Sequence, residues 1–165
     1  MYNRKREPLS EEAKNLIHYL ERYGVCLGRK KTLEARRISI LREFENPLSA
    51  INYSGMPKSN QISAGSASLA IKLDEIECKI IEQQNQAAKV LLDVIAVIDF
   101  LEDGTLEREV LEHRYIDCTN WERTCKKMHL TRTPANEYWR KALDKLLTFK
   151  KVQQIIKEYS ESIER

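Results

Sequence analysis

Three helical patterns follow one another between residues 105 and 147, and this segment constrains the fold more than any other part of the chain. Apolar residues on one helical face define the first pattern: Leu106, Val110, Leu111 and Tyr115. Asn120 can cap a second helix, because its side chain accepts a hydrogen bond from an unpaired backbone N–H group. This helix is predicted over residues 121–128, with Trp121, Cys125 and Met128 buried on its inner face.

A third helix is predicted to begin at Thr131, which can cap it as Asn120 caps the second. Pro134 falls in its first turn, where the missing N–H group of proline costs no helical hydrogen bond. Its inner face comprises Ala135, Tyr138, Ala142, Leu143 and Leu146. Two capped helices joined by His129 and Leu130 predict a helix-turn-helix unit.

These residues resemble the helix-turn-helix of region four of bacterial sigma factors. The family's Glu-Arg-Glu-x-Leu-x-x-Arg-Tyr helix is matched by Glu107, Arg108, Glu109, Leu111, Arg114 and Tyr115. Its Ser-Arg start of the recognition helix resembles Thr131–Arg132, and its closing Ala-Leu-x-x-Leu resembles Ala142, Leu143 and Leu146. The chain departs from the family at His129 (usually Gly), at Pro134 (an Arg) and at Thr124–Cys125 (an Ile-Ala pair). The resemblance implies a DNA-binding unit with the same helix order.

The most regular helical pattern precedes this unit. Its apolar or small residues recur in steps of four and three, at Leu69, Leu73, Ile76, Ile80, Ala87, Val90, Val94, Val97 and Leu101. Only Gln83 interrupts this heptad seam, which predicts a helix able to form a coiled coil. Its partner is either an earlier helix of the same chain, which gives an antiparallel hairpin, or the same helix of a second chain, which gives a homodimer. We favour the hairpin, because the earlier helix otherwise has no surface on which to bury its apolar residues.

That earlier helix is predicted from Ser10 to Glu45, after a basic arm at residues 4–6. Gly24 and Gly28 weaken it by ~1 kcal/mol each relative to Ala, so a kink or break is expected there. A linker rich in Gly, Ser, Pro and Asn follows, and its segment Tyr53–Lys58 either docks on a partner or folds back on the chain.

The C-terminal residues have a helical pattern of their own, with Val152, Ile155, Ile156, Tyr159 and Ile163 on one face. They either extend the third helix of the unit or form a separate helix that docks or dimerises. The predicted fold is all-α: a long helical hairpin or coiled coil, followed by the sigma-like helix-turn-helix. The predicted divisions are residues 1–45 (arm and long helix), 46–68 (linker), 69–103 (coiled-coil helix), 104–148 (helix-turn-helix) and 149–165 (C-terminal helix).

This order of elements, with a Tyr-Ser-Gly-Met-Pro linker, resembles small phage proteins related to the ArpU-like and RinA-like late transcription regulators. The resemblance extends from Ala13 to Leu147. It implies control of phage or prophage transcription in a bacterial host cell and no catalysis.

Charge is distributed unevenly along the chain, although the formal net charge is only +3. Residues 1–60 carry 12 basic and 7 acidic residues, residues 61–119 carry 5 and 12, and residues 120–165 carry 11 and 6. This segregation is typical of a DNA-contacting end joined to a middle that contacts protein or itself.

The predicted partner is double-stranded DNA at a promoter or operator. In a helix-turn-helix, residues early in the recognition helix enter the major groove, and the outward positions here are Arg132, Thr133, Asn136, Glu137 and Arg140. Arg can bind guanine O6 and N7, and Asn can bind adenine N6 and N7. Phosphates would be bound by Lys126, Lys127 and Lys141, together with the start of the helix after Asn120. Direct contact with bacterial RNA polymerase is a further expectation.

The alternative function is that of a helical adaptor, which binds polymerase, another regulator or a packaging component without reading DNA. An enzyme is not expected, because no glycine-rich phosphate loop and no nucleophile with a neighbouring base occur, and no cofactor is predicted. A metal site built from His113, Cys118, Cys125 and His129 is disfavoured, since the paired cysteine spacing of structural zinc sites is missing. Residues 1–8 are polar and no apolar run of about 20 residues follows, so we expect no membrane span and a cytoplasmic location.

Overall fold

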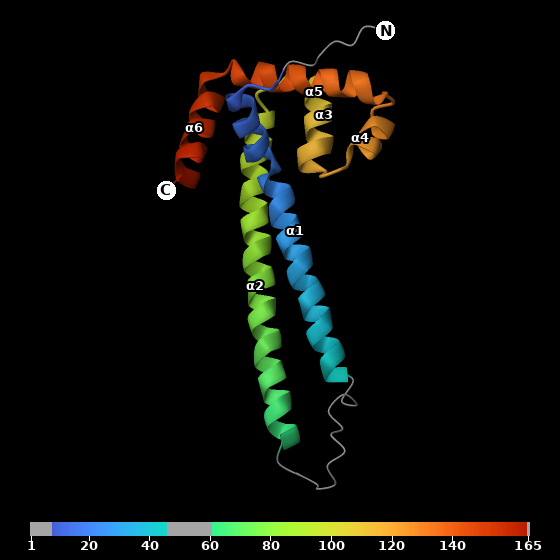
Figure 1. The fold of residues 1–165 in the computed structure, drawn as a ribbon, viewed down its shortest axis with the longest axis vertical. Helices are drawn as coiled ribbons and strands as arrows, with labels where there is room; N and C mark the ends of the chain where they lie inside the picture. Colours follow the sequence, from blue (N-terminus) through green and yellow to red (C-terminus); the bar gives the residue numbers. More distant parts are fainter. Residues whose placement is uncertain (1–7, 46–60, 165) are drawn as a thin grey trace. The chain divides into compact units, whose positions relative to one another are not determined.

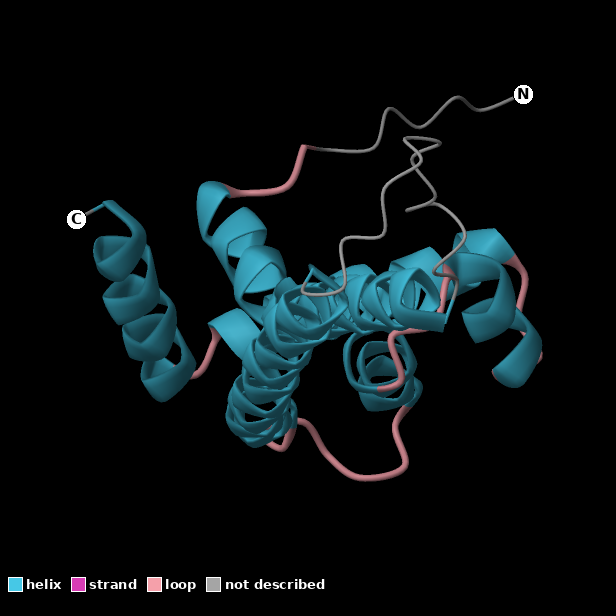
Figure 2. Cartoon of the chain, turned by 90° about the horizontal axis from the view of Figure 1, so that it is seen from below, coloured by secondary structure: helices cyan, strands magenta, loops and turns pink. Residues whose placement is uncertain are grey.

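The computed structural model describes residues 8–45 and 61–164, and every regular element in these ranges is a helix (Figure 1, Figure 2). The elements are α1 (Glu11–Glu45), α2 (Gln61–Ile98), α3 (Leu106–Leu111), the π-helical turn η2 (Glu112–Ile116), α4 (Trp121–Lys127), α5 (Arg132–Leu147) and α6 (Lys150–Glu164). The all-α prediction is confirmed. The basic arm and the segment Tyr53–Lys58 lie outside the described residues.

The predicted linker is too long at its C-terminal end, because α2 begins at Gln61 rather than at residue 69. No proline follows Pro57 in this segment, its alanines favour a helix and its serines disfavour one only weakly. Gly65 costs about 1 kcal/mol relative to Ala but does not forbid the helix. Adding residues to an existing helix requires no new nucleus, so α2 can extend backwards through this polar stretch. At its other end α2 stops at Ile98, five residues earlier than predicted.

Of the two alternatives expected near Gly24 and Gly28, the break is absent, since α1 is one continuous helix from Glu11 to Glu45, and the kink stays a prediction. A glycine lowers helix stability without forbidding the conformation, so packing can hold the helix together across it. A Cβ atom added at Gly24 would lie 3.7 Å from Sγ of Cys118, an ordinary contact distance. Space alone therefore does not require glycine at this position.

Internal contacts divide the chain into two compact units, one of residues 26–88 and one of residues 1–25 and 89–165. In the first unit, antiparallel stretches of α1 and α2 lie side by side (Figure 1), and Nε of Arg37 is 2.8 Å from Oε1 of Glu77. The seam residues Ile76 and Ala87 are buried there. The seam of α2 therefore faces α1 within this unit, as the predicted hairpin requires.

The second unit contains the largest buried side chains, contributed by α1, α2, α3, α5 and α6. Those that are completely buried include Leu16, Leu20, Val94, Val97, Ile98, Val110, Leu111, Leu143, Leu146 and Val152. Burial of one such side chain stabilises a fold by about 1.5–3 kcal/mol, so this core fixes the position of α5.

The C-terminal residues form a separate helix, α6, after a turn at Thr148 and Phe149. Val152 and Ile156 are buried, at 0% and 5% exposure. The ring of Tyr159 lies edge-on to that of Tyr19 with centroids 5.2 Å apart. Of the two expected arrangements, a separate docked helix is therefore the one observed.

Candidate nucleic-acid interface

Helices α4 and α5 occupy the ranges predicted for the last two helices of the helix-turn-helix unit. Oδ1 of Asn120 accepts a hydrogen bond from the backbone N–H of Arg123 at 2.9 Å, so the predicted cap of α4 is present. Thr131 is at the N-cap position of α5 with extended backbone, but its side chain makes no capping hydrogen bond there.

The turn between α4 and α5 closes with two hydrogen bonds. The N–H of Leu130 donates to the carbonyl of Cys125 at 3.0 Å, and that of His129 donates to the carbonyl of Lys126 at 3.3 Å. This pair of bonds is the Schellman arrangement, in which the residue after the C-cap adopts a left-handed conformation. His129 does so with φ of 53°. It occupies the position at which the sigma-factor pattern has Gly.

The inner face of α4 differs from the prediction. Thr124 is completely buried and Met128 is 7% exposed, whereas Trp121 and Cys125 are only half-buried. The hydroxyl of Thr124 is 2.8 Å from that of Thr119 and 2.9 Å from the carbonyl of Asn120, so its burial leaves no unpaired polar group. The prediction used the spacing of apolar residues, which indicates Trp121 and Cys125. Such a pattern leaves out a threonine that is buried because its hydroxyl is hydrogen-bonded.

The predicted DNA-contacting residues differ in exposure. Seven of them are exposed in the structure: Asn120, Lys126, Lys127, Arg132, Thr133, Glu137 and Lys141. Asn136 and Arg140 are half-buried, and Nε of Arg140 is buried. Both lie at the edge of the inner face of α5, one position after Ala135 and Trp139. Arg140 is therefore less outward than predicted, and Thr133, Glu137 and Lys141 form the most open line on α5.

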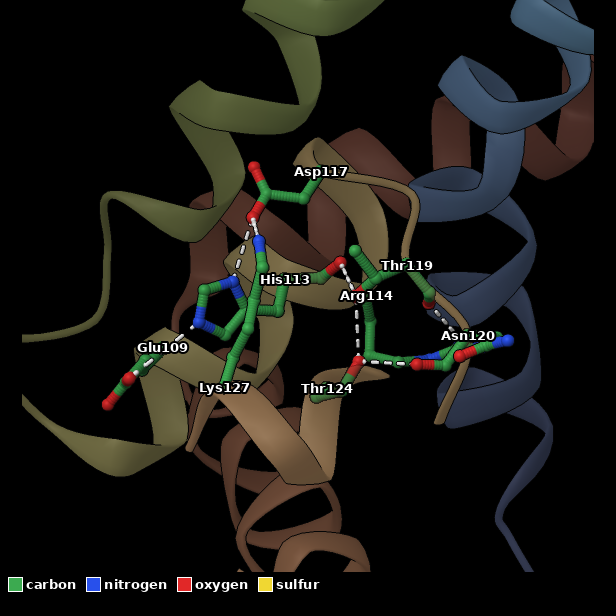
Figure 3. Close-up of polar contacts among 8 residues, drawn as sticks. All are labelled: Glu109, His113, Arg114, Asp117, Thr119, Asn120, Thr124 and Lys127. Carbon is green, nitrogen blue, oxygen red and sulfur yellow. Dashed lines mark hydrogen bonds and ion pairs between the residues drawn. The ribbon is translucent and has the colours of Figure 1, made fainter. Parts of the chain in front are cut away.

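Two of the predicted phosphate-binding residues already have partners. Oδ2 of Asp117 accepts hydrogen bonds from Nζ of Lys127 at 2.7 Å and from Nδ1 of His113 at 2.8 Å (Figure 3). These two bonds, that of Lys127 first, hold the pKa of Asp117 below its ordinary value. Asn120 is engaged as the cap of α4, so a phosphate would compete with the existing partners of both residues.

The same polar cluster fixes the connection between η2 and α4. Nη1 of Arg114 donates to the carbonyl of Thr119 at 2.5 Å, and Oγ1 of Thr119 donates to the carbonyl of His113 at 2.8 Å (Figure 3). Nε2 of His113 is 3.7 Å from Oε1 of Glu109. No group of three or more His, Cys, Asp or Glu side chains able to hold a metal occurs within residues 8–45 and 61–164.

An aromatic stack beside α5 was not predicted from the sequence. The guanidinium carbon of Arg132 lies 4.4 Å from the ring centroid of Trp121, and that of Arg114 lies 4.8 Å from it. The ring of Trp139 meets Trp121 edge-on with centroids 5.9 Å apart. The one feature of the sequence that could have indicated it is composition, because both tryptophans of the chain fall in the helix-turn-helix segment.

An open hollow lies next to this stack, between α4 and the start of α5. Its lining includes Trp121, Cys125, Lys126, Leu130, Thr131 and Arg132. Apolar side chains, the cations Lys126 and Arg132 and one carboxylate, that of Glu122, thus share one surface. Its balance of charge is positive, so it can accept an anionic ligand that also has an apolar face. A nucleic acid combines these two properties.

Comparison with known proteins gives no relatives: no family model, curated protein or solved structure matches the chain. Within the described parts of the chain, no helix has both the length and the apolar character needed to cross a membrane.

Proposed function

We propose that this protein binds double-stranded DNA sequence-specifically through α4 and the start of α5, and that it regulates transcription of phage or prophage genes. One observation carries the proposal. A capped short helix is joined by a closed turn to a 16-residue helix whose first residues, Arg132 and Thr133, are exposed. An exposed N-terminal end of a second helix is what a helix-turn-helix protein inserts into the major groove.

Arg132 is the residue proposed to read bases, because its guanidinium can bind O6 and N7 of guanine together. Thr133 and Glu137 lie beside it on the exposed side of α5. Lys126 and Lys141 are exposed and are proposed to bind phosphates, which orient the protein without specifying sequence. The resemblance to phage late transcription regulators adds activation of late genes to this proposal, and the resemblance to sigma region four adds direct contact with RNA polymerase.

The first experiment is selection of a binding site from random duplexes with the purified full chain, followed by gel shifts over a salt series. Arg132→Ala should lower discrimination between the selected site and a scrambled duplex by about 5- to 150-fold, the equivalent of one good base contact. Affinity of the native protein should fall steeply with salt as counterions are released. Lys126→Ala should weaken both duplexes equally and reduce the salt slope by about one.

Arg29→Ala is the matched control, because Arg29 is an exposed arginine of α1 in the other unit. Its discrimination should equal that of the native protein. Unchanged footprints for Arg132→Ala, or weak binding that ignores sequence in the native protein, would contradict the proposal and favour the adaptor function.

Self-association through α2 is part of the proposal. In the unit of residues 26–88, α2 exposes Ile71 and Ile81, at 61% and 59% of their surface, and Cys78 between them is also exposed. Their spacing of seven and three residues places them on one helical face, opposite an apolar seam that already faces α1. A second copy of the chain would cover this face, and sedimentation of the purified protein measures whether it does.

A further inference from the structure

Trp121 lies at the centre of a stack formed by two guanidinium groups and a second indole. The guanidinium carbons of Arg132 and Arg114 are 4.4 Å and 4.8 Å from its ring centroid. A guanidinium within about 6 Å of an indole centroid is attracted by the negative face of the ring. The two cations thus share one aromatic ring, although like charges repel, so the ring must offset part of that repulsion.

The stack is anchored in the buried part of the unit. Trp139 meets Trp121 edge-on, and its Nε1 donates to the hydroxyl of Tyr115 at 3.0 Å. Tyr115 is only 4% exposed. Arg114, which also contacts the ring of Trp121, donates to the carbonyl of Thr119. These contacts fix the orientation of the Trp121 ring, whereas an indole surrounded by solvent would sample several rotamers.

Arg132 is the exposed end of this stack. An unrestrained arginine samples many rotamers, and ordering it in a complex costs up to about 2 kcal/mol of side-chain entropy. Contact with a fixed indole restricts those rotamers before the ligand arrives, which lowers the cost of binding. Because Arg132 remains exposed, its N–H donors stay accessible to a base edge.

We infer that Trp121 is a positioning residue for Arg132 and thereby sets the preference of this protein for guanine at one position of its DNA site. The inference rests on the proposed function. Trp121 need not contact the base itself, since its effect passes through the orientation of the guanidinium. Loss of the ring should leave the charge of Arg132 and its attraction to phosphates in place, while the directional contact with guanine weakens.

The test uses the full chain carrying Trp121→Leu or Trp121→Phe, with two duplexes that differ only at the guanine contacted by Arg132. The ratio of the two Kd values should fall about three- to tenfold in Trp121→Leu, in line with the strength of a cation–π contact. Trp121→Phe keeps an aromatic face and should retain most of the ratio. Affinity for the scrambled duplex, measured for all three proteins, reports any general loss of binding separately from this ratio.

A double-mutant cycle separates positioning from general destabilisation. In an Arg132→Ala background, Trp121→Leu should have no further effect on the ratio, because the group through which it acts is gone. A further loss of similar size in that background would overturn the inference. Retention of the native ratio by Trp121→Leu, while Arg132→Ala loses it, would also overturn it and would leave the proposed function intact.

A measurement on the native protein covers the case in which Trp121→Leu does not fold. Protons of the Arg132 side chain should show an upfield ring-current shift in NMR spectra, both free and bound to the selected duplex. A shift that is missing in the free protein or lost in the complex would overturn the inference. If the native protein discriminates between no duplexes at all, the proposed function fails, and the inference fails with it.

Discussion

His129 and Cys118 both adopt left-handed backbone conformations, with φ values of 53° and 50°. Such values are unfavourable for residues with a Cβ atom and favourable for glycine. Each residue ends a helical segment, His129 after α4 and Cys118 after η2. The two turns that position α4 are therefore built on residues that do not prefer the required conformation.

We expect His129→Gly to stabilise the protein by about 0.5–1 kcal/mol. Glycine removes the cost of the left-handed conformation, which outweighs the additional entropy of the unfolded chain. The side chain of His129 is exposed, so little packing is lost. Urea denaturation measures the change, and His129→Ala is the matched control, since alanine removes the imidazole while keeping a Cβ atom. Equal stabilities of the two variants would contradict this explanation.

Tyr115 gives the stability of the protein a pH dependence at alkaline pH. Burial raises the pKa of Tyr115 to about 12, and the hydrogen bond from Trp139 offsets part of this rise. The pKa of Tyr115 in the folded protein lies above its value of about 10 in the unfolded chain. The free energy of unfolding therefore keeps its full value below about pH 10 and falls as pH rises from about 10 to 12, where the unfolded chain loses this proton more easily than the folded protein. The loss should reach about 3 kcal/mol, relative to a variant without this hydroxyl.

Tyr115→Phe is that variant, because it packs a ring at the same place and does not ionise. Denaturant melts between pH 8 and pH 12 should show a steeper loss of stability for the native protein than for Tyr115→Phe. Parallel curves would mean that Tyr115 ionises as easily in the folded protein as in the unfolded chain.

At the scale of elements, Arg108 holds the connection from α2 to α3. Its guanidinium lies 2.7 Å from Oδ1 of Asp99 and 2.7 Å from Oε1 of Glu112, and it also donates to the carbonyl of Leu101 at 3.2 Å. Its side chain is 19% exposed. One planar group with five donors thus joins the residues that follow α2 to α3 and to the first residue of η2.

Arg108→Met should lower the free energy of unfolding by about 1–3 kcal/mol, between the values for exposed and buried ion pairs. Arg108→Lys should retain only a small part of the stability that Arg108→Met loses, because an ammonium cannot reach all of these acceptors at once. Thermal or urea denaturation measures both variants, and hydrogen exchange should be faster in α3. Arg36→Met, at an exposed position of α1, should change stability by less than about 0.5 kcal/mol. An Arg108→Met variant as stable as this control would show that the network is not needed.

At the scale of the whole molecule, the segregation of charge along the chain is partly reduced by pairing within the larger unit. Lys127 pairs with Asp117, and Nζ of Lys145 lies 3.5 Å from Oε1 of Glu107. The acidic segment of residues 61–119 thus neutralises part of the basic segment that follows it. The positive field around α5 depends on the cations that remain exposed, among them Lys126, Arg132 and Lys141.

The sequence by itself determined the helical class, the order of the helices and the N-cap of α4. These properties depend on residues close together in the chain: the seam of α2, the cap of Asn120 and the turn at His129 involve neighbours within about one to two helical turns. The same local signals failed at the start of α2 and did not exclude a break at the glycines of α1, because extension of an existing helix and its packing override weak propensities.

Only the tertiary structure decided which sides of the helices face inward and which groups meet. Thr124 rather than Trp121 faces the core because hydrogen bonds to Thr119 and Asn120 satisfy its hydroxyl there. The meeting of Trp121 with Arg114 and Arg132, and the docking of Tyr159 on Tyr19, join residues that lie on separate helices. Such contacts depend on how helices pack around a shared core, and no spacing within a single helix records that packing.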